Sequence, residues 1–158
     1  MGTYMRAVAE VKTLGGWKAN TAAVFMHPVP EWNTAAEDRR PFIEKPFYWQ
    51  SYGMFGFLAG IRNYSETRVL AEPRGLPDDC SRDAATWLQD WSECYGFSWL
   101  NAAELLSFDY EQAFLDQRES PPKATTYRKF LGELFFEHLE ALRGLGEPTS
   151  VRVLVSFN

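Results

Sequence analysis

The stretch Val151-Arg-Val-Leu-Val-Ser-Phe157 decides the fold. Its apolar side chains recur at every second position from Val151 to Phe157, which is the period of a β-strand with one face turned to a core. Near the other end of the sequence, Met5-Arg-Ala-Val-Ala-Glu-Val-Lys12 alternates less regularly and also predicts a strand. We expect these two terminal strands to pair in a small, mostly antiparallel sheet.

The residues between these strands predict an α+β fold in a single domain, 1–158, with helices packed on one face of the sheet. Gly15-Gly16 predicts a turn from which a second strand returns over 17–25. Caps and helical spacing predict the remaining elements. We expect helices over 52–59 in the aromatic stretch 47–62, over 82–93 after a Ser81 cap, from Asn101 to about Phe108, and over 125–143.

The segment 27–46 is rich in proline and charge and predicts a long surface loop. A loop of this length is uncommon inside a compact domain, so it is a candidate for a binding or lid role.

Composition excludes several classes of protein. The 158 residues carry a net charge of −5, which argues against a protein that coats duplex nucleic acid. No apolar run is long enough to span a bilayer, and no secretory signal is visible at Met1. Cys80 and Cys94 lack the close spacing of a zinc site, so we expect no metal and no cofactor, and free thiols in a cytoplasmic protein.

Three segments and the final strand carry a family resemblance. The segments are Tyr52-Gly-Met-Phe-Gly-Phe-Leu-Ala-Gly-Ile-Arg-Asn63, Ala71-Glu-Pro-Arg-Gly-Leu-Pro-Asp-Asp79 and Ser98-Trp-Leu-Asn-Ala-Ala-Glu-Leu-Leu-Ser-Phe-Asp109. Over most of residues 47–158 the chain resembles a widespread family of small phage-encoded accessory proteins. It departs from that family at Tyr95-Gly-Phe97, where many relatives carry a histidine. The resemblance implies a phage protein in the cytoplasm of an infected bacterium, and a share of such proteins counter host defence.

Arginines and aromatic residues near one another in sequence favour a nucleotide-like ligand, since guanidinium groups bind phosphate and aromatic faces stack on bases. The candidate ligand-binding residues are Trp49, Tyr52, Arg62, Asn63, Arg74, Asp78 and Trp99. We therefore expect a phage anti-defence protein that sequesters a nucleotide-derived immune signal, such as a cyclic oligonucleotide or cyclic ADP-ribose. The pocket is expected to be completed in a homo-oligomer. The same residues are also explained by core packing and by surface ion pairs.

Two other functions stay open from the sequence. An adaptor or inhibitor would bind a host defence protein directly, through the acidic surface and the 27–46 loop. A small hydrolase would use Asp78, Asp79, His27 or Asp109 as acid, base or metal ligand. Capping of the helix after Ser81 explains the aspartates more simply, and no common catalytic motif is present.

Overall fold

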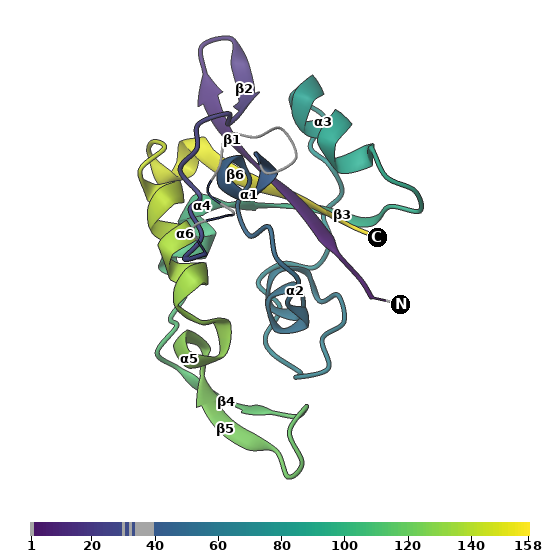
Figure 1. Cartoon of the computed structure of the whole chain (residues 1–158), viewed down its shortest axis with the longest axis vertical. Helices are drawn as coiled ribbons and strands as arrows, with labels where there is room; N and C mark the ends of the chain where they lie inside the picture. The colour runs from purple at the N-terminus through teal and green to yellow at the C-terminus, as the bar shows by residue number, and fades with distance from the viewer. Residues whose placement is uncertain (1, 30, 32, 34–39) are drawn as a thin grey trace.

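In the part of the chain that the structure describes, residues 2–29, 31, 33 and 40–158, four antiparallel strands form the central sheet (Figure 1). In this computed structural model the strand order is β2 (Gly16–Ala19), β1 (Met5–Thr13), β6 (Val151–Phe157) and β3 (Tyr95–Asn101). The predicted pairing of the terminal strands is confirmed, with Ala7 opposite Val155 and Ala9 opposite Val153. The predicted turn at Gly15-Gly16 joins β1 to β2, which is shorter than expected.

Helices and one further hairpin complete the α+β fold, which confirms the predicted class. The helices are α1 (Pro41–Glu44), α2 (Tyr52–Ala59), α3 (Arg82–Gln89), α4 (Ala102–Ser107), α5 (Tyr127–Leu131) and α6 (Glu133–Arg143), with a 3-10 turn at Pro148–Ser150. The predicted caps are present: the Ser81 side chain accepts from the Ala84 N–H, and Asn101 forms a capping box with Glu104. None of the helices described is long and apolar enough to cross a membrane.

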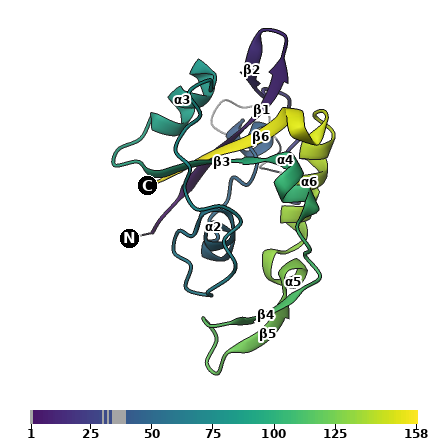
Figure 2. The same cartoon turned by 180° about the vertical axis from the view of Figure 1, so that it is seen from behind.

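Helices cover both faces of the sheet, so the predicted packing on one face alone is wrong. On one face, Ala7 and Val153 belong to the main core, which also holds buried residues of α2, α4 and α6. On the other face, Val8 and Leu154 pack with Ala84 and Leu88 of α3. Figure 2 shows α2 and α3 on opposite sides of β6 and β3. The reason is that β6 is buried along its whole length, so both of its faces are covered even though one alternating set holds Arg152 and Ser156 beside Leu154.

The expected helix over 125–143 is interrupted. Gly132 adopts a φ of +85°, which ends α5, and α6 begins after it as a separate helix. Thr125 lies in β5 (Lys123–Thr126), which pairs with β4 (Ala113–Asp116) in a hairpin that the sequence did not predict. The apolar stripe nevertheless points inward as expected, since Tyr127 and Phe135 are both fully buried.

The segment 27–46 is not a plain surface loop at its described positions. Pro41–Glu44 form α1, and His27 and Ile43 are buried. Residues 30, 32 and 34–39 of this segment lie outside the described part of the chain. Its described ends therefore pack against the body of the protein and bring Phe42 beside the candidate site.

Candidate functional site

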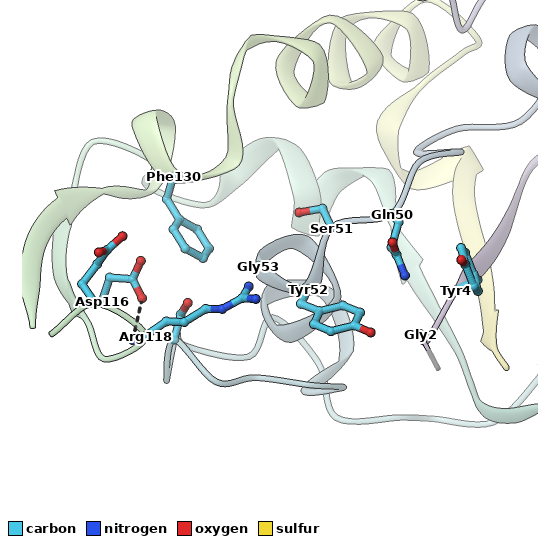
Figure 3. A pocket seen from close by; sticks show the side chains of 11 residues that line it. Gly2, Tyr4, Gln50, Ser51, Tyr52, Gly53, Asp116, Arg118 and Phe130 are labelled. Carbon is cyan, nitrogen blue, oxygen red and sulfur yellow. Dashed lines mark hydrogen bonds between the residues drawn. The ribbon is translucent and has the colours of Figure 1, made fainter.

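Two cavities open side by side in the described part of the chain, and both are lined by Tyr4 and Gln50. The smaller, here the aromatic pocket, has a volume of about 420 Å³ and is lined by Tyr4, Met5, Arg6, Phe42, Tyr48, Trp49, Gln50 and Trp91. The larger, here the polar pocket, has a volume of about 830 Å³ (Figure 3). It is lined by Gly2, Tyr4, Gln50, Ser51, Tyr52, Gly53, Ser65, Asp116, Arg118, Glu119 and Phe130.

The aromatic pocket combines aromatic faces with a guanidinium group. The Arg6 Cζ lies 4.1 Å from the ring centre of Trp87 and 4.7 Å from that of Trp91. Arg6 Nη1 donates to the backbone oxygen of Trp87 at 2.9 Å. Trp87 lies in the last turn of α3 and Trp91 follows the end of that helix, and the Arg6 guanidinium contacts both rings. No carboxylate among the described residues forms an ion pair with Arg6, so its positive charge remains available to an anion.

Two further polar groups lie near the Arg6 side chain. The Lys45 ammonium, outside the pocket lining, lies 5.1 Å from the Trp87 ring centre, and burial lowers the pKa of that lysine. The indole Nε1–H of Trp91 is buried without a hydrogen-bond acceptor among the described residues. A buried donor without an acceptor costs roughly 1–3 kcal/mol, so a ligand acceptor reaching it would be favourable.

Trp49 is held in the pocket wall by a buried histidine. The His138 ring packs edge-on against Trp49, with ring centres 5.1 Å apart. The Phe47 N–H donates to His138 Nδ1 at 3.0 Å, so Nε2 carries the proton and donates to the Met26 oxygen at 3.2 Å. Burial, and secondarily the neighbouring His27, lowers the pKa of His138 to about 4. His138 is therefore neutral at pH 7 and acts as a structural support for Trp49.

Thr3 organises the wall between the two pockets. Its N–H donates to the Tyr52 hydroxyl at 2.9 Å, and its oxygen accepts from the Gln50 amide at 2.9 Å. Its hydroxyl accepts from Arg62 Nε at 2.9 Å, while Arg62 Nη1 donates to the Tyr64 hydroxyl at 2.8 Å. Arg62 thus lies behind the site as a positioning residue, whereas Tyr52 lines the polar pocket directly.

The polar pocket receives a cation from the β4–β5 turn. Arg118 follows β4, and its side chain extends toward Tyr52 and Gly53, with Cζ 5.8 Å from the Tyr52 ring centre (Figure 3). The Asp116 carboxylate accepts from the Arg118 backbone N–H at 3.0 Å, and the Gln117 N–H donates to the Ser65 oxygen at 3.2 Å. These bonds tie the turn to the body of the protein.

Arg74 and Trp99, predicted as ligand-binding residues, form a separate group. The Arg74 guanidinium lies 4.7 Å from the Trp99 ring centre and forms two hydrogen bonds to the Glu104 carboxylate, at 2.8 and 2.6 Å. This pairing holds the pKa of Glu104 below its usual range. Neither Arg74 nor Trp99 lines the two pockets, and the charge of Arg74 is already balanced.

Asp78 and Asn63, also predicted as ligand-binding residues, lie outside the pocket linings as well. Asp78 is exposed on the turn before α3. The Asn63 side chain closes its own loop, because Oδ1 accepts from the Thr67 N–H at 3.0 Å and Nδ2 donates to the Thr67 oxygen at 3.0 Å. It also lies against α2, where a Cβ on Gly56 would come within 2.6 Å of Oδ1.

The residues considered for hydrolysis have different partners. Asp79 pairs with Arg152 at 3.1 Å, and Asp109 accepts from the Glu111 N–H at 3.0 Å. His27 packs between the rings of Phe42 and Trp49. Within the described residues there is no group of three or more histidine, cysteine, aspartate or glutamate side chains that could hold a metal ion.

Of the seven predicted site residues, Trp49 and Tyr52 therefore line the pockets. Arg6, Trp91 and Arg118 were missed. The pair Trp87 and Trp91 at helical spacing was the available signal for part of this site, but the approach of Arg6 from β1 depends on how α3 packs on the sheet. Comparison with protein-family models, with curated proteins and with solved structures gave no match.

Proposed function

We propose that this protein binds a small nucleotide-like molecule in the aromatic pocket and sequesters it without converting it. The observation that carries this proposal is the Arg6 guanidinium, which stacks on Trp87 and Trp91 beside a 420 Å³ cavity and has no carboxylate partner among the described residues. A concave, mostly aromatic cavity with a few polar groups is the usual form of a small-molecule site.

The ligand chemistry follows from these groups. Base stacking on an aromatic face contributes roughly 1–3 kcal/mol per base, and Tyr48 and Trp49 supply such faces. A charge-assisted bond from Arg6 to a phosphate contributes roughly 1.5–3 kcal/mol more. A planar, anionic molecule satisfies both requirements, whereas a neutral aliphatic one satisfies neither.

The resemblance to phage accessory proteins supports a biological role for such binding. A phage protein that holds a nucleotide-derived immune signal, of the cyclic oligonucleotide or cyclic ADP-ribose type, would keep that signal from its host sensor. Such a protein competes through slow release, because affinity differences lie mostly in the dissociation rate. It needs no catalytic group.

A depletion-and-release experiment tests this function. The purified protein is mixed with a panel of cyclic oligonucleotides and cyclic ADP-ribose isomers, and the free ligand is measured by chromatography before and after heat denaturation. We expect depletion of one panel member, followed by its intact recovery. A new product peak would instead establish hydrolysis. If no panel member is depleted, the adaptor function remains as the alternative, and capture of a partner from host lysate tests it.

A matched pair of variants assigns the binding to the aromatic pocket. Arg6→Met keeps the stacked stem but removes the charge, and we expect depletion to be lost with little change in melting temperature. Arg143→Gln, on the exposed end of α6, is the control and should bind like the unaltered protein. Light scattering with and without the panel member tests whether the pocket is completed in a homo-oligomer.

A further inference from the structure

We infer that the polar pocket holds the ribosyl phosphate of the same molecule, with Arg118 binding the phosphate and Asp116 accepting a hydrogen bond from the ribose. This inference rests on the proposed function, and it narrows the ligand class to nucleotides whose sugar and phosphate extend past Gln50. It also gives a role to the β4–β5 hairpin, which lies at the far end of the molecule from β2 (Figure 1).

The first argument is that the two cavities adjoin. Tyr4 and Gln50 line both, so a molecule bound in the aromatic pocket lies next to the polar pocket and reaches it across these two side chains. Figure 3 shows the lining running from Tyr4 and Gln50, past Tyr52, to Arg118 and Phe130. A planar base fits within a 420 Å³ cavity, and the adjoining 830 Å³ has room for the sugar and phosphate.

The second argument is the state of Arg118. Among the described residues no carboxylate forms an ion pair with its guanidinium, which faces the Tyr52 ring. Its backbone is fixed, because its N–H is bonded to Asp116 and the neighbouring Gln117 is bonded to Ser65. An exposed arginine on a fixed backbone can form the two parallel hydrogen bonds that phosphate favours.

The third argument is the mixed charge of the lining. Asp116 and Glu119 stand beside Arg118, so the pocket carries two carboxylates and one guanidinium. Two carboxylates repel a free phosphate ion, but carboxylates accept hydrogen bonds from ribose hydroxyls in nucleotide-binding folds. Asp116 Oδ1 is used by the Arg118 N–H, which leaves Oδ2 for a hydroxyl. This lining therefore favours a phosphorylated ribose over inorganic phosphate.

A comparison of each nucleoside with its monophosphate tests the contributions of the two pockets separately. Adenosine, AMP, guanosine and GMP are titrated into the protein, with quenching of tryptophan fluorescence and calorimetry as readouts. We expect one monophosphate to bind about tenfold tighter than its nucleoside, and inorganic phosphate not to compete. In Arg118→Gln that ratio should fall to about one, while the nucleoside affinity is unchanged. Arg128→Gln, an arginine on α5 paired with Glu111, is the control and should keep the ratio.

The outcomes distinguish this inference from the proposed function. If neither nucleosides nor monophosphates bind, the proposed function fails for these probes and the inference fails with it. If nucleosides bind but the monophosphate gains nothing, or Arg118→Gln keeps the ratio, only the inference is overturned. For the ribose, Asp116→Asn retains Oδ1 for the turn and should abolish the preference for adenosine over 2′,3′-dideoxyadenosine. Retention of that preference would remove Asp116 from the site.

Discussion

Arg6 and Arg74 both stack on tryptophan rings, yet among the described residues Arg74 has a carboxylate partner and Arg6 has none. The Arg74 guanidinium sits 4.7 Å from Trp99 and is bound by both oxygens of Glu104. Arg6 sits 4.1 Å from Trp87 and has a backbone oxygen as its only recorded hydrogen-bond acceptor among the described residues. An arginine on an aromatic face is therefore a candidate for a ligand site where its charge has not been balanced within the protein.

Arg152 also stacks on a tryptophan ring and pairs with a carboxylate, but its side chain is buried. Its Cζ lies 3.9 Å from the Trp17 ring centre, and its Nε donates to Glu10 at 2.8 Å. The side chains of Arg152 and Glu10 are 6% and 0% exposed, against 31% and 34% for Arg74 and Glu104. The Glu10 carboxylate also accepts from the Ser81 N–H at 2.7 Å and so joins α3 to the sheet.

The largest effect is expected when the buried pair is broken. Glu10→Gln leaves the Arg152 charge buried without its main partner, and we expect a loss of about 3–5 kcal/mol in the free energy of unfolding. Urea denaturation measures this loss. Glu111→Gln, in an exposed pair with Arg128, is the control and should cost less than about 1 kcal/mol. An equal effect of the two variants would contradict the assigned role of Glu10.

Acid should produce the next largest effect, because protonated His138 is a buried cation with no carboxylate partner in the part of the chain that the structure describes. Its pKa is lowered from 6.5 to about 4, so the unfolded chain binds the proton more readily. Stability is then full above pH 6.5 and falls between pH 6.5 and 4, by about 3 kcal/mol in total. Denaturation at pH 7, 5.5 and 4 measures this fall. His138→Gln should show a shallower fall, and an unchanged slope would assign the pH dependence to other groups.

Ligand affinity should distinguish Arg6 from Arg74. Arg6→Met is expected to weaken binding of the depleted panel member about 10- to 100-fold, which is roughly 1.5–3 kcal/mol. Arg74→Met should leave the same affinity unchanged, because its charge is already paired outside both pockets. Calorimetry on the two variants measures the difference. The reverse result would move the site to Trp99.

The smallest effect concerns the Glu104 pair. Since Arg74 lowers the pKa of Glu104, the pair stabilises the fold above the usual glutamate pKa of 4.5 and is lost as pH falls through the lowered value. Both side chains are about a third exposed, so we expect Arg74→Gln to cost at most about 1 kcal/mol at pH 7. The cost should decrease as the pH falls below 4.5, because the Glu104 carboxylate is then progressively protonated. A cost that does not change with pH would show that stacking on Trp99, rather than the ion pair, stabilises this region.

Local sequence signals predicted several of the elements, but not α1, β3 or the β4–β5 hairpin, and not all of the boundaries. The alternation in 151–157, the turn at Gly15-Gly16 and the Ser81 cap each act over a few residues, and each was found where expected. The helix over 125–143 was wrong because apolar spacing continues through Gly132, where the backbone adopts a φ of +85° and α5 ends. The β4–β5 hairpin is short and weakly apolar, so its pattern was not recognised.

The sequence alone determined the paired terminal strands, the helix caps and the supply of arginines and aromatic residues, because those depend on spacing and residue type. Only the tertiary structure decided which arginines keep an available charge. Arg74 meets Glu104 across 30 residues, and Arg152 meets Glu10 across 142. Glu10 meets Arg152 because the two residues are opposite each other in the β1–β6 register, and Arg74 reaches Glu104 because of the path of the loop before α3. The sequence predicted that the two strands pair but not this register or loop path, which balance two of these charges and leave Arg6 beside an aromatic cavity.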